Sequence, residues 1–238
     1  MNEESNAAPR GSALAQLGNL FVAPAQALDF ADRRAKMLWL PLLITLACQA
    51  ALGAWFALTV NLGSWRAAIL QGIAARNPEA ASHAAQMYAH HGRAILLGQF
   101  AGGGVVWLLI IELLFALYLF LADKIFSADS RGYGRWFSFT AWTSLPMALG
   151  SIAGMVAWAL SNHAANFDLL AVTSLNTLFF HLHPGDAYYR LAQFSILQFW
   201  TIGLMVFGLK RWCRHGTSKA LGIALAPYVV VYGLLFLF

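Results

Sequence analysis

The sequence has 238 residues, of which 60% are apolar and 11% are charged. Soluble domains carry about 45–50% apolar and about 25% charged residues, so the composition excludes a water-soluble fold and predicts an integral membrane protein. The formal net charge of +5 comes from Lys and Arg between apolar stretches, a pattern typical of membrane topology and anionic headgroups rather than nucleic acid.

Residues 1–36 are predicted to form a cytoplasmic leader with an amphipathic segment. Leu14, Leu17, Leu20 and Phe21 recur at helical spacing and form one apolar stripe. Pro24 stands where a second short helix could begin. This stripe either lies on the inner leaflet or packs on the ends of the helix bundle, and the two interpretations are compatible.

Residues 37–238 are predicted to form an all-α transmembrane domain. A helix needs roughly 20 apolar residues to cross a bilayer core of ~30 Å. Five stretches qualify, which predicts a five-helix bundle with spans near 38–60, 95–121, 139–160, 191–209 and 220–238.

The segments between these spans differ in character. Residues 61–94 hold two stretches of mixed polarity that Asn77-Pro78 separates. Residues 161–190 contain an apolar run from Leu169 to Phe180, which is too short to span and predicts an interfacial or re-entrant helix, with Asp168 as a candidate cap at its start.

Lys and Arg are distributed unequally between the two sides. Eleven fall in the leader and in the loops after spans two and four, and four (Arg66, Arg76, Arg93 and Arg190) fall on the other side. The positive-inside rule then puts the N-terminus in the cytoplasm and Phe238 outside. The residues expected at the membrane surface are Arg33, Arg34, Lys36, Lys124, Arg131, Arg135, Lys210, Arg211 and Arg214, which lie beside Arg10 and Lys219 on this side.

Glu112 is the one formally charged residue well inside a predicted span. A charge in a bilayer costs several kcal/mol, so the carboxyl must be protonated, paired or open to water. Ser151, Gln198 and Thr201 lie at similar predicted depth. These four side chains predict one of two roles for Glu112. It is either a site that binds a proton or a cation, or a carboxyl that fixes helix packing by hydrogen bonds.

Six of the seven histidines fall on the predicted outer side. His83, His181 and His183 are candidate metal ligands, because imidazole suits copper and zinc. Their spacing matches no metal motif and no carboxylate recurs beside them, so ordinary interfacial histidines are the alternative, and neither metal nor cofactor is expected.

Motifs of nucleophilic or metal-dependent catalysis are missing from the sequence. It has no Gly-x-Ser-x-Gly, no His-Glu-x-x-His and no paired glutamates in a predicted span. The sequence therefore favours a protein that is not an enzyme.

Two segments resemble the Yip-domain family of multi-pass membrane proteins. The leader LGNLFVAPAQALDFADRRAKMLWLPLLI is similar to the family's entry into its first helix, where a Leu/Phe-x-x-Pro segment precedes a short amphipathic stretch. The loop SADSRGYGRWFSFTAWTSLPMALG resembles the family's loop between helices two and three, with Gly132, Gly134, Trp136, Phe137, Phe139 and Pro146 at the matching positions.

The resemblance implies five helices and a cytoplasmic N-terminus, and it fits the bacterial branch of the family. The Asp-Leu-Tyr-Gly-Pro motif of eukaryotic members is missing, so their trafficking role is not carried over. We expect a non-enzymatic membrane scaffold or partner-binding protein in a bacterial inner membrane, with membrane lipids and, as a further option, other membrane proteins as partners. The alternative is a transporter of a small solute, ion or lipid that uses Glu112 in a membrane cleft.

Overall fold

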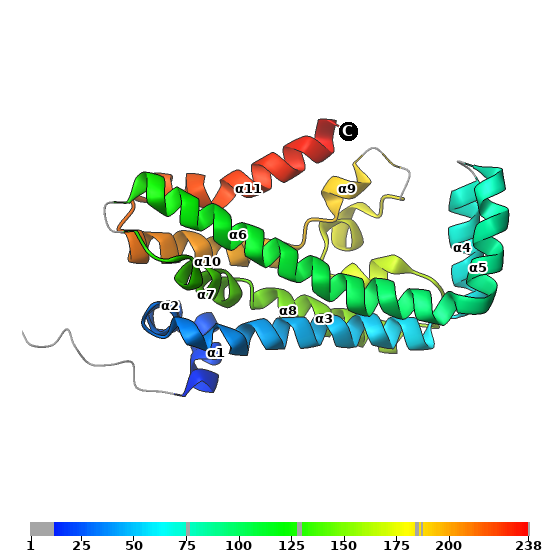
Figure 1. Cartoon of the computed structure of the whole chain (residues 1–238), viewed down its shortest axis with the longest axis horizontal. Coiled ribbons are helices and arrows are strands. Elements are labelled where there is room, and N and C mark those ends of the chain that lie inside the picture. Colours follow the sequence, from blue (N-terminus) through cyan, green and yellow to red (C-terminus); the bar gives the residue numbers. More distant parts are fainter. Residues whose placement is uncertain (1–11, 75–76, 128–129, 184–185, 187, 238) are drawn as a thin grey trace, which may run out of the picture. The chain divides into compact units, whose positions relative to one another are not determined.

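The computed structural model describes residues 12–74, 77–127, 130–183, 186 and 188–237, so the first eleven residues of the predicted leader and Phe238 lie outside the described part. Across the described ranges the elements are helices, accompanied by one isolated bridge between Ser174 and Ser195, and the all-α prediction is confirmed. In chain order (Figure 1) the α-helices are α1 (Ala13–Val22), α2 (Pro24–Arg33), α3 (Trp39–Thr59), α4 (Leu62–Ala74), α5 (Pro78–Leu96), α6 (Gly104–Phe126), α7 (Tyr133–Thr143), α8 (Pro146–Ala159), α9 (Tyr189–Ala192), α10 (Ile196–Cys213) and α11 (Thr217–Leu237).

Within the described ranges, four helical stretches are long and apolar enough to cross a membrane: Ala35–Thr59, Pro78–Phe126, Tyr133–Ala159 and Thr217–Phe236. They overlap four of the five predicted spans. The remaining prediction, 191–209, overlaps α10, which has 18 residues, carries Lys210 and Arg211 in its last turn, and is not one of the four. The prediction of a multi-pass helical membrane protein is confirmed.

The second of these stretches continues well beyond its predicted span of 95–121. Pro78–Phe126 is a single helical stretch of 49 residues, in which a π-helical segment, η2 (Leu97–Gly103), joins α5 to α6. The π-helical turn widens the backbone where small residues such as Gly102 and Gly103 offer no side-chain obstacle.

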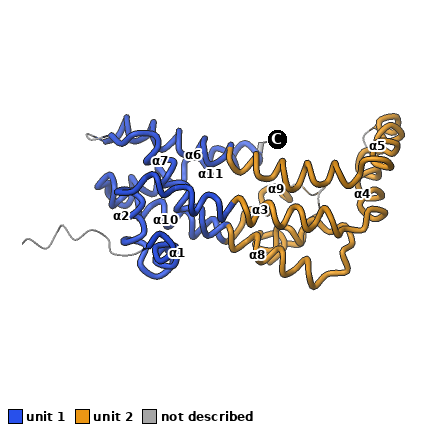
Figure 2. Tube along the Cα trace, turned by 60° about the horizontal axis from the view of Figure 1, so that its bottom comes forward, with its two compact units in different colours: residues 1–45, 110–147, 197–238 blue, residues 46–109, 148–196 orange. Residues whose placement is uncertain are grey.

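The chain forms two compact units, each described here by itself (Figure 2). Unit 1 consists of residues 1–45, 110–147 and 197–238, and unit 2 consists of residues 46–109 and 148–196.

The core of unit 1 is aromatic and lies where α2, α7 and α10 meet. The rings of Trp136 and Phe139 on α7 lie 5.7 and 4.8 Å from the ring of Trp212 on α10. Gly208 lets α10 approach this closely, because a Cβ at that position would collide with the Phe139 ring. All three aromatic side chains are buried.

The predicted amphipathic leader is part of this core. Helices form at 13–22 and 24–33, as the apolar stripe and Pro24 predicted. Leu20 of the stripe is fully buried, as are Leu28 and Phe30 on α2, so these positions pack within unit 1. Leu14, at the start of the stripe, and Val22 are 70% and 81% exposed, and this leaves apolar side chains for the predicted contact with lipid.

Helix α11 contains a proline whose effect is compensated by α6. Pro227 has no N–H, so the carbonyl of Ile223, four residues earlier, has no donor within the helix. The hydroxyl of Tyr118 on α6 donates to that carbonyl at 2.9 Å. One turn earlier on α6, the ring of Phe115 lies 5.4 Å from that of Tyr228. These contacts join the second half of α6 to the middle of α11.

Unit 2 has its own aromatic core, built around Phe56 on α3. Its ring lies 4.8 Å from Phe100 and 4.9 Å from Trp158. Gly53 lets α3 approach the π-helical segment, because a Cβ there would collide with the backbone carbonyl of Phe100. Helices α4 and α5 form a hairpin in which the Trp65 ring packs 5.0 Å from that of Tyr88.

The predicted interfacial segment at 169–180 is only partly helical. A 3₁₀ turn, η3 (Phe167–Ala171), and a π-helical turn, η4 (Asn176–Phe180), replace the expected continuous helix. The cap at its start is Asn166 rather than Asp168: the Asn166 side chain accepts a hydrogen bond from the backbone N–H of Asp168 at 3.0 Å. The prediction placed the cap and the start of the helical turn two residues too late.

Candidate functional site

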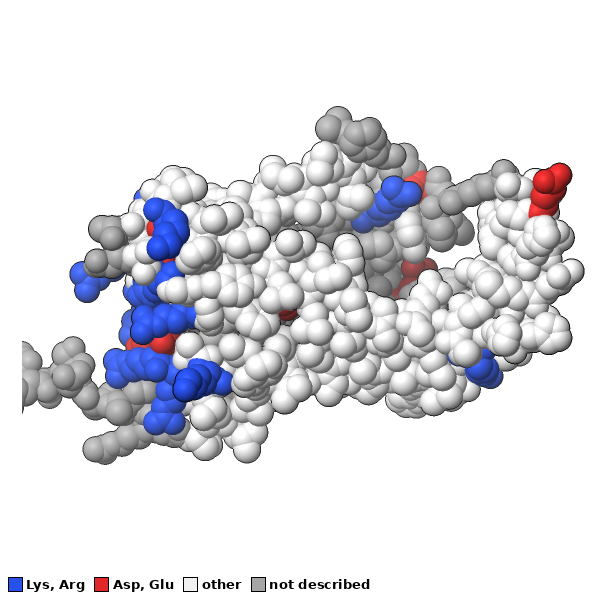
Figure 3. Space-filling model, viewed as in Figure 1, with Lys and Arg blue, Asp and Glu red and all other residues white. Residues whose placement is uncertain are grey.

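The nine basic residues predicted at the membrane surface all belong to unit 1. Lys and Arg gather at one end of this unit (Figure 3), and we call this surface the basic end. It comprises the described Lys and Arg of unit 1: Arg33, Arg34, Lys36, Lys124, Arg131, Arg135, Lys210, Arg211, Arg214 and Lys219. Three described carboxylates, Asp29, Asp32 and Asp123, lie among these ten cations, so the surface keeps a positive excess.

Asp32 on α2 joins the leader to the loop between α6 and α7 and to the first turn of α7. Its carboxylate accepts from Arg131 Nε at 3.3 Å and Arg131 Nη2 at 3.5 Å, and Arg135 Nη1 lies 3.7 Å away. The guanidinium carbon of Arg131 also stands 5.4 Å from the centre of the Trp212 ring, a cation–π contact. Arg131 is therefore held in one orientation by a carboxylate and an indole.

Asp29, one turn earlier on α2, pairs with Arg211 at the end of α10. The two contacts, from Nε and Nη2, are both 2.5 Å long and form a bidentate pair, the strongest geometry for Arg and a carboxylate. The Asp29 carboxylate raises the pKa of Arg211 above its already high ordinary value. The neighbouring Trp212 Nε1 donates to the backbone carbonyl of Leu28 at 3.2 Å. These contacts fix α2 against α10.

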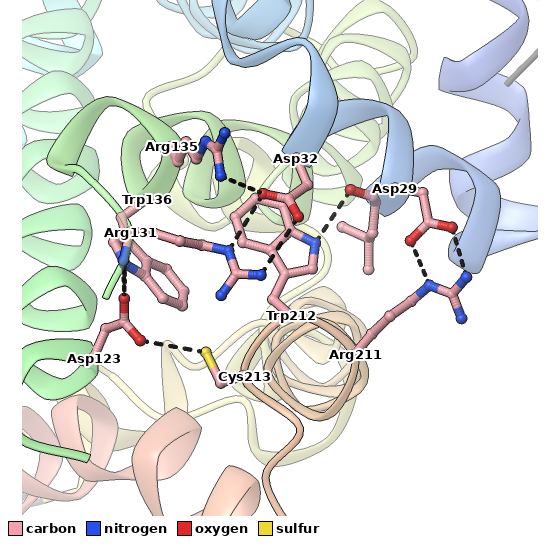
Figure 4. A network of polar contacts seen from close by, with 10 residues as sticks. Asp29, Asp32, Asp123, Arg131, Arg135, Trp136, Arg211, Trp212 and Cys213 are labelled. Atoms are coloured by element: carbon pink, nitrogen blue, oxygen red, sulfur yellow. Dashed lines mark hydrogen bonds and ion pairs between the residues drawn. The ribbon is translucent and has the colours of Figure 1, made fainter. Parts of the chain in front are cut away.

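Asp123 organises the loop between α6 and α7 (Figure 4). Its carboxylate accepts from the backbone N–H of Arg131 at 2.6 Å, from Trp136 Nε1 at 3.1 Å and from the Cys213 thiol at 3.6 Å. Burial, with the nearby charge of Asp123 as a second cause, raises the pKa of the Cys213 thiol to about 11. Cys213 is therefore a neutral donor and not a reactive thiolate at neutral pH.

Two pockets open on the basic end. The first has a volume of about 450 Å³ and is lined by Ser127, Ser130, Arg131, Arg135, Trp212, Cys213 and Arg214. The second has a volume of about 510 Å³ and is lined by Asp32, Arg33, Arg34, Ala35, Lys36, Met37 and Arg135. Arg135 lines both pockets, so cations and hydroxyl groups from the leader, from α7 and from the end of α10 face connected surfaces.

Glu112 lies buried in unit 1, with 6% of its surface exposed. The side chains of Thr140 and Ser144, from α7 and the residue that follows it, interact with its carboxyl. Its Oε2 atom has no partner among the described residues. Tyr228 on α11 also interacts electrostatically with the carboxyl. Glu112 thus links α6 to α7 and lies beside α11.

The structure gives the other three residues predicted near Glu112 different surroundings from that carboxyl. Gln198 bonds the side chain of Tyr232. Thr201 is buried, and its hydroxyl has no hydrogen-bond partner in the described part of the chain. Ser151 belongs to unit 2, where it donates to Gln49 Oε1 at 3.3 Å. Thr201 therefore makes no hydrogen bond to the carboxyl in the described part of the chain, and Ser151 and Glu112 belong to different units.

The candidate metal ligands lie in unit 2. His83 is on α5, His181 has a left-handed backbone (φ 53°) at the end of η4, and His183 Nδ1 lies 3.8 Å from Asp186. In the part of the chain that the structure describes, no three His, Cys, Asp or Glu side chains are grouped so as to hold a metal ion.

The sequence reading missed the residues that position the site. Asp29 and Asp32 lie three residues apart on α2, which puts them on one helix face next to Arg33, but a topology count of Lys and Arg ignores carboxylates. Thr140 and Ser144 lie near the start of the predicted span 139–160, at a different depth from Glu112, and only the folding of the chain at the α7–α8 junction brings them beside the carboxyl.

Comparison with known proteins agrees with this arrangement of apolar helices, leader and inner loop. A model of the Yip1 domain matches residues 18–238, nearly the whole chain. No curated protein and no solved structure gives a significant match. The chain belongs to the Yip1 domain family.

Proposed function

We propose that this protein is a non-enzymatic membrane scaffold whose basic end gathers anionic lipid headgroups. The observation that carries the proposal is the collection of ten described Lys and Arg side chains against three described carboxylates, Asp29, Asp32 and Asp123, at the basic end of unit 1. Each Lys or Arg near an anionic leaflet contributes about 1 kcal/mol of attraction, so such an excess favours negatively charged lipid strongly.

The carboxylates support a binding surface because they position cations rather than cancel them. Asp32 is shared by two arginines, and Asp29 holds Arg211 in a bidentate pair. Guanidinium groups fixed in this way lose less conformational freedom when they bind a headgroup. Arg33 and Lys36 are exposed beside them and add charge.

The proposal places the basic end at the inner leaflet of a bacterial plasma membrane, where anionic lipid and the positive-inside rule agree. Lipids are then the first partners, and other membrane proteins come together around the lipid that the scaffold concentrates. The neutral Cys213 thiol and the carboxylates already engaged in ion pairs and hydrogen bonds support a binding role over a catalytic one.

The experiment reconstitutes the full chain into nanodiscs of phosphatidylcholine with phosphatidylglycerol as a minor component. The lipid that copurifies after gentle detergent extraction is then quantified. We expect the wild type to retain phosphatidylglycerol above its bulk fraction. This enrichment should fall several-fold in the triple variant Arg33→Gln, Arg34→Gln, Lys36→Gln, because about 1 kcal/mol of attraction is lost with each charge.

Arg190→Gln removes an exposed cation of unit 2 and serves as the control. High salt should reduce the enrichment of the wild type, because screening shortens the range of surface charge. Equal phosphatidylglycerol fractions in the wild type, the triple variant and the bulk bilayer would contradict the proposal.

Transport through a membrane cleft is a second candidate, favoured by one observation. A carboxyl that is 6% exposed and leaves one oxygen without a described partner is the kind of group that binds a proton or cation within a membrane. Glu112→Gln in proteoliposomes tests it: loss of a proton or cation flux with an intact fold would support transport. A flux that is unchanged, or absent from the wild type, would remove this candidate.

A further inference from the structure

We infer that the pocket formed by Ser127, Ser130, Arg131, Arg135, Trp212 and Arg214 is a specific phosphate site of the basic end. This inference rests on the proposed function and deepens it, because it distinguishes one built site from a general surface attraction. The ligand class is a phosphate group, supplied either by a lipid headgroup or by a small phosphate ester in solution.

The lining of the pocket has the chemistry that phosphate binding requires. Guanidinium groups bind phosphate through forked N–H donors, and serine hydroxyls add neutral donors. Three arginines and two serines face the same pocket of about 450 Å³, which is ample for a phosphate with its glycerol or alcohol substituent. The indole of Trp212 forms an apolar wall beside them.

Two of the arginines are held in place before any ligand arrives. Arg131 is fixed by Asp32 and by the Trp212 ring, and its backbone N–H is held by Asp123. Arg135 Nη1 lies 3.7 Å from the same Asp32 carboxylate while the Arg135 side chain remains 53% exposed. Its other nitrogens can therefore donate to a ligand.

Arg214 supplies the charge that these carboxylates do not offset. No described carboxylate pairs with it, and its side chain lines the pocket. Its backbone is left-handed, with φ 54°, a conformation that suits Gly or Asn and is unfavourable for Arg. An arginine at this position costs stability, and the pocket gives the guanidinium a role there.

The hydroxyl of Ser127 is the second feature that points to a ligand. Its Oγ atom is buried and makes no well-formed hydrogen bond with the described residues, although it lies beside the Asp123 carboxylate and the Cys213 thiol. Buried polar atoms in native proteins usually have a partner. A phosphate oxygen in the pocket would accept from this hydroxyl.

The test uses the full chain in a neutral detergent and counts bound lipid by native mass spectrometry. Short-chain phosphatidic acid, phosphatidylglycerol and phosphatidylcholine are titrated separately. We expect one saturable site for the two anionic lipids and none for phosphatidylcholine. Arg214→Gly removes the guanidinium and relieves the left-handed backbone, so the fold survives, and affinity should fall by about tenfold or more.

Arg135→Ala and Ser127→Ala give independent second measurements, with smaller losses expected for the serine. Arg190→Gln, in unit 2, should leave the affinity unchanged. Glycerol 3-phosphate added at increasing concentration separates the two sources: competition at the concentration of the lipid assigns the site to phosphate esters in general, and competition only at far higher concentration assigns it to the lipid headgroup.

Failure of this inference and failure of the proposed function give different results. The specific site is wrong if the wild type and Arg214→Gly bind anionic lipid equally. It is also wrong if Lys124→Ala, a change outside the pocket, weakens binding as much as Arg214→Gly does. In both cases general surface attraction remains. If the wild type binds phosphatidic acid and phosphatidylglycerol no better than phosphatidylcholine, both in detergent and in nanodiscs, both proposals fail.

Discussion

Glu112 is the residue whose role can be derived most directly from its neighbours. The side chains of Thr140 and Ser144 interact with its carboxyl, and each hydroxyl also reaches a backbone carbonyl, that of Phe137 at 3.0 Å and that of Ala141 at 3.4 Å. A hydroxyl can both donate and accept, so either hydroxyl can bond the carboxyl in either direction. Glu112 therefore links α6 to α7 through polar contacts.

We predict that Glu112→Gln preserves the fold, because an amide can both donate to and accept from the hydroxyls of Thr140 and Ser144. Glu112→Leu should destabilise the protein by about 1–3 kcal/mol, because it leaves the hydroxyls of Thr140 and Ser144 without this partner. Thermal unfolding in detergent compares the two variants with the wild type. If the glutamine variant melts as low as the leucine variant, the packing role is wrong.

At the element scale, helix α10 offers a matched pair of glycines. A Cβ at Gly208 would collide with the Phe139 ring, whereas a Cβ at Gly203 has no atom within 4 Å. Gly208→Ala should cost about 1–3 kcal/mol through overpacking. Gly203→Ala should be neutral or stabilising by up to about 1 kcal/mol, because alanine favours the helix. Melting curves that coincide for the two variants would show that α10 does not approach α7 closely.

The contact between α6 and α11 predicts coupling between two residues far apart in the sequence. Tyr118→Phe removes the only described donor to the Ile223 carbonyl and should cost about 0.5–1.5 kcal/mol. In a Pro227→Ala background the helix supplies its own N–H, so the same change should cost less. A double-mutant cycle of unfolding free energies measures the difference, and additive effects would exclude the proposed compensation.

The sequence predicted those elements that follow from periodicity and composition. Leu17, Leu20 and Pro24 located two short leader helices because helical spacing and proline act locally. The continuation of α5 into α6 was not predictable in the same way, since polar residues such as His90 suggested a loop and the backbone continues through them regardless. Tertiary packing, which periodicity does not report, decides such cases.

The candidate site was likewise predictable from the sequence only in part. The side of the bilayer to which the basic residues belong follows from counting charges, so their common location in unit 1 was predictable. The partners of each arginine were not, because Asp29, Asp32 and Asp123 reach them across sequence separations of 182, 99 and 8 residues. The pocket and the left-handed Arg214 likewise exist only once α7 and α10 have packed.

For the whole molecule, every functional conclusion depends on which leaflet the basic end meets. Anionic lipid is concentrated in the cytoplasmic leaflet, and a basic end on the other side would meet little of it. The positive-inside count and the family's expected topology both predict a cytoplasmic location for the basic end.

Cysteine accessibility in cells measures this orientation directly. In a Cys48→Ala, Cys213→Ala background, Ser218→Cys reports the basic end and Asn162→Cys reports the loop after α8, and both positions are exposed. With a membrane-impermeant maleimide, the account predicts labelling at 162 in intact cells and labelling at 218 only after permeabilisation. Labelling at 218 in intact cells, with 162 protected, would contradict it.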